Sequence, residues 1–298
     1  MTEARPVGRV QAWLHAVRIP TLAAAFVPVA VGTALAARDH HFRLAPALLA
    51  LWGAIFIQIG TNLVNDLGDF HRGADTGPRL GPPRALAMGW LTEREIRTGI
   101  AVSFALATLA GLLLARIAGP AVIAIGIASI LAGAWYTAGP WPLAYHGLGE
   151  LFVFLFFGVV AVCGTYYVQA RIVSLDALLA SIPVGSLSTA ILVVNNVRDL
   201  EGDRDAGKRT LAVRMGRRAA RWGYVLLLAA AYVTPLALLL TGRAAAWALL
   251  PFLTLPLALR EGRRVTREQG ARLNAALLGT ARLHVLFGIL FAAGLSIA

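Results

Sequence analysis

The stretch LAPALLALWGAIFIQIGTNLVNDLGDFHRGAD, residues 44–75, decides the fold. Segment 44–66 is predominantly apolar and long enough for one helical membrane crossing, which takes about 20 residues. The stretch nevertheless carries Asp66, Asp69 and Asp75 at its end, although the whole chain has only 15 acidic residues. Acids placed where an apolar segment ends indicate a membrane helix that opens on a ligand or ion site.

The composition of the whole chain supports a membrane protein. Of its 298 residues, 58% are hydrophobic and 14% charged, and the mean hydropathy is +0.70, far from the values of a soluble domain. We predict an all-α, polytopic protein with nine transmembrane helices and its termini on opposite sides of the membrane. The nine apolar runs are 19–37, 44–66, 97–116, 119–137, 148–168, 176–197, 222–241, 244–259 and 275–297.

The net charge of +12 is explained by topology and does not require a nucleic-acid partner. Cytoplasmic loops of membrane proteins carry an excess of Lys and Arg. A cytoplasmic N-terminus places 21 of the 27 basic residues on the cytoplasmic side. We therefore expect a cell-membrane protein whose acid-bearing loops are cytoplasmic and whose C-terminus is outside. Anionic membrane lipid is the expected partner of these charges.

Seven of the 15 acids fall in two windows, 66–75 and 199–205. Each window ends an even-numbered predicted helix, which suggests one domain over residues 1–298 built from two similar halves, about 1–137 and 138–298. If the helices continue into the windows, one face of each carries a polar stripe. These stripes are Asn62, Asp66 and Asp69, and Asn195, Asp199 and Asp203.

The two stripes have the chemistry of a magnesium–diphosphate site. Carboxylates about 4 Å apart repel by about 1 kcal/mol in water and about 4 kcal/mol at an intermediate dielectric, so such clusters favour bound cations. Mg²⁺ is commonly held by one or two carboxylates together with substrate phosphates. Cationic side chains flank both windows, and Lys208, the only lysine of the chain, offers a point charge to phosphate. Solvated loop charge explains a single acid but not the repeated pattern, whereas for Lys208 a positive-inside role stays open.

A phosphate-binding loop is excluded by its context. Residues 202–208, GDRDAGK, match the first seven positions of G-x-x-x-x-G-K-[ST], but Arg209 occupies the eighth position. No strand is predicted before this segment, and two aspartates would point into a loop that should hold an anion.

The two windows resemble the aspartate-rich motifs of the UbiA superfamily of intramembrane aromatic prenyltransferases. The matching patterns are Asn65-Asp66-x-x-Asp69 with Asp75, and Asn196-x-x-Asp199-x-x-x-Asp203. Longer blocks are most similar to the members of this superfamily that prenylate 1,4-dihydroxy-2-naphthoate in menaquinone synthesis. These blocks are GPPRALAMGWLT (81–92), YTAGPWPLAYHGLGELFVFLFFG (136–158), GTYYVQ (164–169) and NNVRDLEGDRDAGKRTLAVRMG (195–216).

The resemblance implies a nine-helix bundle around a central cavity, in which Mg²⁺, as two ions by analogy with the two motifs, binds a polyprenyl diphosphate. It assigns metal binding to Asn65, Asp66, Asp69, Asp75, Asn196, Asp199 and Asp203. Within that set, the catalytic residues are Asp66, Asp69, Asp199 and Asp203. The diphosphate would be bound by Arg72, Arg84, Arg198, Lys208 and Arg209.

An aromatic acceptor must reach the allylic cation before water does, so the cavity wall should be apolar or aromatic. Candidate acceptor-binding residues are Tyr136, His146 and Glu150, with core packing or interfacial capping as their alternative roles. The expected reaction is prenyl transfer to 1,4-dihydroxy-2-naphthoate with loss of CO₂, giving demethylmenaquinone.

Other functions stay open at this point. Relatives of the same superfamily act on 4-hydroxybenzoate, chlorophyllide, haem or a glycerol phosphate ether. The CDP-alcohol phosphotransferases also combine aspartates with Mg²⁺, but their D-G-x-x-A-R run is absent here. A cation transporter would carry its acids between broken helices at mid-membrane, whereas here both clusters follow apolar runs and lie beside basic residues.

Overall fold

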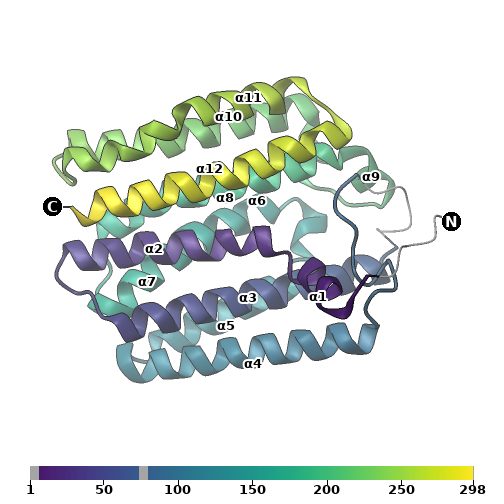
Figure 1. The fold of residues 1–298 in the computed structure, drawn as a ribbon, viewed down its shortest axis with the longest axis horizontal. Helices are drawn as coiled ribbons and strands as arrows, with labels where there is room; N and C mark the ends of the chain where they lie inside the picture. Colours follow the sequence, from purple (N-terminus) through teal and green to yellow (C-terminus); the bar gives the residue numbers. More distant parts are fainter. Residues whose placement is uncertain (1–6, 74–79, 298) are drawn as a thin grey trace.

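The computed structural model describes residues 7–73 and 80–297, and every regular element among them is helical (Figure 1). The longest helices lie side by side along one axis and form a bundle. They are α2 (Ala23–Arg38), α3 (Leu44–His71), α4 (Glu93–Ala118), α8 (Leu175–Arg198), α10 (Leu211–Leu240) and α12 (Leu273–Ser296). The helix α1 (Arg9–Val17) begins at the end that carries α9 (Leu200–Asp205), and α12 ends at the opposite end.

Seven helical segments of the described chain are long and apolar enough to cross a membrane. Some of these seven segments join an α-helix to a short 3-10 or π-helical stretch without a break. The seven segments are Arg9–Arg38, Leu44–His71, Glu93–Ala118, Gly149–Ala170, Leu175–Arg198, Leu211–Leu240 and Gly270–Ser296. The chain is therefore a multi-pass, all-helical membrane protein.

The two remaining predicted runs are helical but do not have the dimensions of a full crossing. Helix α5 (Ala121–Trp135) has 15 residues and covers about 22 Å, less than the about 30 Å of a hydrocarbon core. Run 244–259 is divided between the 3-10 helix η4 (Ala246–Thr254) and α11 (Leu255–Arg267), and α11 continues into an arginine-rich turn. The expected boundary at 259 was too early, because the helix does not end where its apolar residues end.

Close backbone contact places the middle of the chain against α8. After α6 (Gly149–Val153), the chain forms a π-helix, η3 (Phe154–Val160), and then α7 (Ala161–Ala170). A Cβ atom added to Gly158 would lie 2.7 Å from the Cα of Gly185, so side chains are excluded at this crossing. The contact sets α6 beside the C-terminal half of α8, where the second polar stripe lies.

The second stripe is not part of one continuous helix, contrary to the expectation. Helix α8 ends at Arg198, and Asp199 (φ −93°, ψ 8°) separates it from α9. The one-turn spacing survives, because the amide of Asp199 donates to Asn195 O (3.0 Å) and that of Asp203 to Asp199 O (2.8 Å). The chain thus changes direction at Asp199, but Asn195, Asp199 and Asp203 remain one hydrogen-bonded turn apart.

Candidate functional site

A cavity of about 1400 Å³ lies inside the bundle, with one polar region and a long apolar wall. Along α3 its lining runs from Asp69 back to Ala50, 19 residues that cover about 28 Å of helix. The polar lining contains Asn65, Asp66, Asp69, Arg84, Asn195, Asn196, Arg198, Asp199, Asp203 and Lys208. The apolar wall includes Ile123, Ile127, Ile130, Phe152, Phe156, Phe157, Val160 and Leu192.

The first acid pair is buried and already carries cationic partners. Asp66 and Asp69 are each 2% exposed near the end of α3. Arg84 forms an ion pair with Asp69 Oδ2, and its Nη1 lies 3.7 Å from Asp66 Oδ1. The amide of Leu86 donates to Asp66 Oδ2 at 3.3 Å. The segment after the first window therefore folds back over its acids.

In the second window, a guanidinium holds the acid that follows it. Arg198 is 3% exposed and donates to Asp199 through Nε (2.8 Å) and Nη2 (2.6 Å). It also donates to Asn195 Oδ1 at 2.8 Å and to Asn274 Oδ1 at 2.9 Å. A Cβ on Gly81 would lie 2.7 Å from Arg198 Nη2, so the loop after the first window comes close to the second window at residue 81.

Lys208 connects the two windows. Its Nζ lies 3.0 Å from Asp69 Oδ1 and 3.9 Å from Asp203 Oδ1. Burial raises the pKa of Asp203 to about 6; Lys208 opposes the rise, and Asp199 and Asp69 add to it. Additional positive charge at this point would favour the ionised form of Asp203.

Tyr145 is a contact that the sequence did not reveal. Its hydroxyl donates to Asp69 Oδ1 at 3.1 Å, and its ring lies 5.0 Å from both the Lys208 ammonium and the Arg72 guanidinium. Burial and the nearby Asp69 raise the pKa of Tyr145, so this hydroxyl stays protonated as a donor. Only its position within block 136–158 could have drawn attention to it, because no local spacing links Tyr145 to the acids.

Two of the predicted diphosphate residues have side chains outside the cavity lining. Arg72 donates to Gly139 O at 2.7 Å. Arg209 is exposed, and its contact with the site is through its amide, which donates to Tyr145 O at 3.1 Å. Arg84, Arg198 and Lys208 all line the cavity.

Of the three predicted acceptor-binding residues, one lines the cavity and two do not. Tyr136 lines the cavity. His146 stacks on Trp141 with ring centroids 4.2 Å apart, and its Nδ1 lies 2.9 Å from Pro142 O, away from the lining. Glu150 is buried behind the lining, where its Oε1 accepts a hydrogen bond from Asn196 Nδ2 at 2.9 Å. Glu150 is thus placed to orient Asn196.

The predicted metal ligands do not form a ready-made ion site. Within residues 7–73 and 80–297, no three His, Cys, Asp or Glu side chains converge closely enough to hold a metal ion. Oδ1 of Asn65 accepts from Thr137 Oγ1 at 2.7 Å. Asp66 Oδ1, however, is a buried carboxylate oxygen that lacks a hydrogen-bond partner in the described chain, as expected of an oxygen available to a cation. Asp75 lies outside the described residues.

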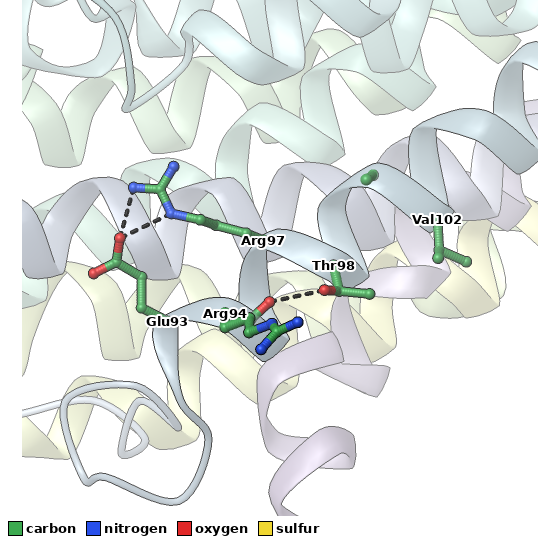
Figure 2. Close-up of a pocket in the computed structure, with 6 residues that line it drawn as sticks. Glu93, Arg94, Arg97, Thr98 and Val102 are labelled. Atoms are coloured by element: carbon green, nitrogen blue, oxygen red, sulfur yellow. Dashed lines mark hydrogen bonds and ion pairs between the residues drawn. The ribbon is translucent and has the colours of Figure 1, made fainter.

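A second hollow, of about 500 Å³, lies on the surface of α4 (Figure 2). Glu93 and Arg97 pair there at 2.6 Å, one turn apart, and Thr98 donates to the carbonyl of Arg94. None of the predicted site residues borders it, and its lining comes from one helix. The candidate site is therefore the large cavity.

Comparison with known proteins gives a consistent result over nearly the whole chain. The pattern of the UbiA prenyltransferase family matches residues 25–295. The chain is 42% identical over 283 residues to a 1,4-dihydroxy-2-naphthoate octaprenyltransferase of Mycobacterium tuberculosis, with 95% of each chain covered. It is 37% identical over 302 residues to the protein of the same name from Escherichia coli, covering 99% of this chain and 98% of that one.

Solved structures share the fold at low sequence identity. A UbiA homolog from Aeropyrum pernix K1 superposes with a TM-score of 0.70 at 17% identity, covering 93% of this chain and 97% of that one. A UbiA homolog from Archaeoglobus fulgidus bound to DMAPP and Mg²⁺ gives a TM-score of 0.66 at 18% identity, with 96% and 99% covered.

Proposed function

The chain belongs to the UbiA prenyltransferase family, and we propose that it transfers a polyprenyl group from polyprenyl diphosphate to 1,4-dihydroxy-2-naphthoate, with loss of CO₂, to give demethylmenaquinone. The observation that carries this proposal is the identity of 37–42%, over nearly the full chain, to enzymes named for that acceptor. The cavity adds physical support, since it joins an ionic region to an apolar wall of the kind that a prenyl diphosphate needs.

The proposed topology has nine membrane helices around this cavity. Helix α5 and the pair η4–α11 would complete the seven long spans, with local thinning or a shallow position accommodating their length. The arginine distribution supports a cell-membrane location with the N-terminus and the acid-bearing loops cytoplasmic and the C-terminus outside.

We propose Mg²⁺ as the cofactor, as two ions, because each half of the chain supplies one set of oxygen donors. The proposed ligands are Asn65, Asp66, Asp69, Asp75, Asn196, Asp199 and Asp203. Carboxylate and amide oxygens suit this ion, and Asp66 Oδ1, which makes no hydrogen bond in the described chain, fits the assignment. The bound ion would supply charge stabilisation for the leaving diphosphate.

The basic residues of the chain assist the same leaving group. Arg84, Arg198 and Lys208 line the cavity and are now paired with Asp69, Asp199 and Asp69, respectively. A bound diphosphate would give each of these three side chains a more highly charged partner. When Arg84 and Lys208 turn from Asp69 to the diphosphate, the Tyr145 hydroxyl would still donate a hydrogen bond to Asp69. Fixed cationic donors stabilise the charge that develops on the leaving oxygen more than the ground state.

The apolar wall serves the other end of the donor. Phe152, Phe156 and Phe157 line the cavity from α6 and η3, where the polyprenyl chain would lie. These rings exclude water from an allylic cation, which would otherwise be hydrolysed, and their faces attract positive charge. Tyr136 borders the same space and would contact the acceptor ring.

The chemistry of the acceptor gives a direct test. A new bond from the allylic carbon to the ring carbon that carries the carboxylate leaves no ring proton to lose there. The carboxylate must then leave as CO₂, returning its electron pair to the ring. The product of the transfer itself is a quinol, and a separate two-electron oxidant, such as dioxygen, converts it to the quinone. Prenylation of 4-hydroxybenzoate occurs beside the hydroxyl and keeps the carboxylate.

The experiment supplies purified protein in lipid nanodiscs with polyprenyl diphosphate and 1,4-dihydroxy-2-naphthoate labelled in its carboxylate. We expect one labelled CO₂ for each prenyl group transferred, and little turnover of 4-hydroxybenzoate. A prenylated product that retains the label would rule out the reaction. Ion flux in liposomes without prenyl transfer would instead favour a cation transporter.

A further inference from the structure

Two buried polar side chains deep in the cavity lack partners for one atom each. Gln58 on α3 is 7% exposed and Ser188 on α8 is 4% exposed, and both line the cavity. Gln58 Oε1 and Ser188 Oγ make no hydrogen bond within the described residues. Leaving a buried polar atom without a hydrogen bond is unfavourable, so each of these two oxygens is a candidate for a bound partner.

Local hydrogen bonds fix which end of the Gln58 amide is left without a partner. Thr21 Oγ1 donates to Arg18 O, so this hydroxyl oxygen acts as an acceptor toward other groups. Asn62 Nδ2 donates to Val17 O and to Thr21 Oγ1, both at 2.8 Å, which leaves Asn62 Oδ1 as an acceptor. Gln58 Nε2 donates to these two acceptors at 3.3 Å each. Its carbonyl oxygen must therefore point away from them.

Ser188 differs from Ser103 and Ser129, which also lie in helices of the bundle. Ser103 and Ser129 donate to the carbonyl four residues earlier, at 2.7 and 2.8 Å, which satisfies a helical hydroxyl locally. Ser188 does not, although it is buried. Ser186 shares this property on the same helix but is not among the cavity-lining residues, which makes it a natural control.

Both side chains lie well along their helices, away from the acids. Gln58 precedes Asp69 by eleven residues of α3, or about 16 Å, and Ser188 precedes Arg198, the last residue of α8, by ten residues, or about 15 Å. Both are neutral, unlike the ionic region above them. Their depth and neutrality suit an uncharged polar group of a substrate, not its diphosphate.

We propose that Gln58 and Ser188 form an acceptor subsite that binds the hydroxyl groups of the aromatic substrate. Gln58 Oε1 can only accept a hydrogen bond, so its partner must carry a donor such as a phenolic hydroxyl. A carboxylate or a quinone carbonyl cannot satisfy it. The subsite therefore selects a hydroxylated, reduced ring, and it rests on the proposed prenylation of 1,4-dihydroxy-2-naphthoate.

The test combines protein variants with acceptors that lack one hydroxyl. Equilibrium binding of 1,4-dihydroxy-2-naphthoate, 1-hydroxy-2-naphthoate and 4-hydroxy-2-naphthoate is measured on the full chain in nanodiscs. The variants are Gln58→Met, which keeps the length of the side chain, and Ser188→Ala. We expect each variant to weaken binding of the dihydroxy acceptor about five- to ten-fold, the effect of one neutral hydrogen bond. Removing the matching hydroxyl should then cost nothing further in that variant.

Matched controls separate this subsite from a general effect on packing. Ser186→Ala removes an equally buried hydroxyl from the same helix and should leave acceptor binding unchanged. Thr21→Val removes one of the two acceptors that orient the Gln58 amide and should therefore reduce the discrimination between the acceptor and its analogues. Thermal unfolding reports whether each variant folds. If Gln58→Met does not fold, the comparison of Ser188→Ala with Ser186→Ala tests the subsite.

The outcomes separate the subsite from the proposed function. If the variant and the missing hydroxyl weaken acceptor binding additively in both Gln58→Met and Ser188→Ala, the subsite is overturned. If the two effects are non-additive at one residue alone, the other residue does not belong to the subsite. Wild-type protein that fails to prenylate 1,4-dihydroxy-2-naphthoate overturns the proposed function instead. Turnover by the wild type together with additive losses removes only the subsite.

Discussion

Lys208 Nζ lies 3.0 Å from Asp69 Oδ1, which joins a loop of the second half of the chain to the end of α3 in the first. Asp69 is almost fully buried, and its carboxylate also pairs with Arg84. Arg84 also lies near Asp66 and Lys208 near Asp203, so the two cations are shared among acids of both windows. The contact therefore holds the two acid windows together.

Replacing Lys208 with methionine should weaken the use of polyprenyl diphosphate. A hydrogen bond from a charged donor contributes about 1.5–3 kcal/mol, so we expect kcat/KM for the diphosphate to fall about ten- to one-hundred-fold. Lys208→Arg should retain part of the activity, because it keeps the charge but changes its geometry. Steady-state kinetics with either substrate varied provides the measurement. An unchanged KM and kcat for the diphosphate would place Lys208 outside the diphosphate site.

The four central acids should be needed for turnover but not for folding. Asp66→Ala, Asp69→Ala, Asp199→Ala and Asp203→Ala are each expected to abolish prenyl transfer. These acids line the cavity beside Arg84, Arg198 and Lys208 and do not belong to the apolar core, so the variants should still insert and unfold cooperatively. Activity in nanodiscs and thermal unfolding test both statements. Near-normal activity in any two variants would refute a site built from both windows.

Removing divalent cations should stop the reaction reversibly. The buried acids and the diphosphate repel one another unless cations lie between them. We expect no turnover in excess EDTA and recovery with Mg²⁺ or Mn²⁺, while the thermal unfolding temperature without substrate changes little. Full activity in EDTA would contradict the assignment of the acid windows to metal binding.

Much of the fold was predictable because a bilayer imposes long apolar runs. Run 44–66 continues into α3, and the one-turn spacing of Asn62 and Asp66 on that helix followed from its period. The limits were less predictable where helices continue past their apolar residues, as α11 does to Arg267. Run 119–137 gave a shorter helix, α5, because Tyr136 begins a turn that brings the chain back over the cavity.

The features of the site that depend on charge and on spacing in the sequence were predictable. Asp66, Asp69, Asp199 and Asp203 all line one cavity, as the two windows indicated. Tyr145 could not be found, because its contact with Asp69 depends on tertiary packing. Asn62 was assigned to the polar stripe, yet its amide is used to hold Val17 and Thr21. A period shows which face a residue occupies, but not which neighbour it binds.

An ion-pair network at the opposite end of the bundle should make stability sensitive to acid. Asp39 accepts hydrogen bonds from Arg38 Nε (2.8 Å) and Tyr166 OH (2.7 Å). Burial alone would raise the pKa of Asp39, but these two donors lower it below its usual value. A lowered pKa means that the stabilisation is present above the unfolded-state value of about 3.9 and is lost as the pH falls below it.

Asp39→Asn should therefore lower stability at pH 7 and lose most of that difference near pH 3. The effect should be at most about 1 kcal/mol, because water screens partly exposed pairs. Tyr166→Phe removes one donor but keeps the charge, so it should retain the pH dependence. Thermal unfolding in detergent at both pH values provides the comparison. A deficit in Asp39→Asn that persists at pH 3 would assign the effect to packing.

Cysteine labelling can test the proposed orientation in the membrane. The only native cysteine, Cys163, is half-buried, and replacing it with alanine gives a background for single cysteines. Leu80, Met215 and Thr266 are exposed at or beside the basic loops, whereas Val173 is 82% exposed between α7 and α8. Excess Arg on one side predicts that cysteines at 80, 215 and 266 react only with a cytoplasmic reagent. A cysteine at 173 should react with a reagent added outside the cell, and a tag at the C-terminus should be accessible from outside. Labelling of residue 80, 215 or 266 by an impermeant reagent added to intact cells would contradict the nine-helix topology, since it would place an acid-bearing or arginine-rich loop on the exterior.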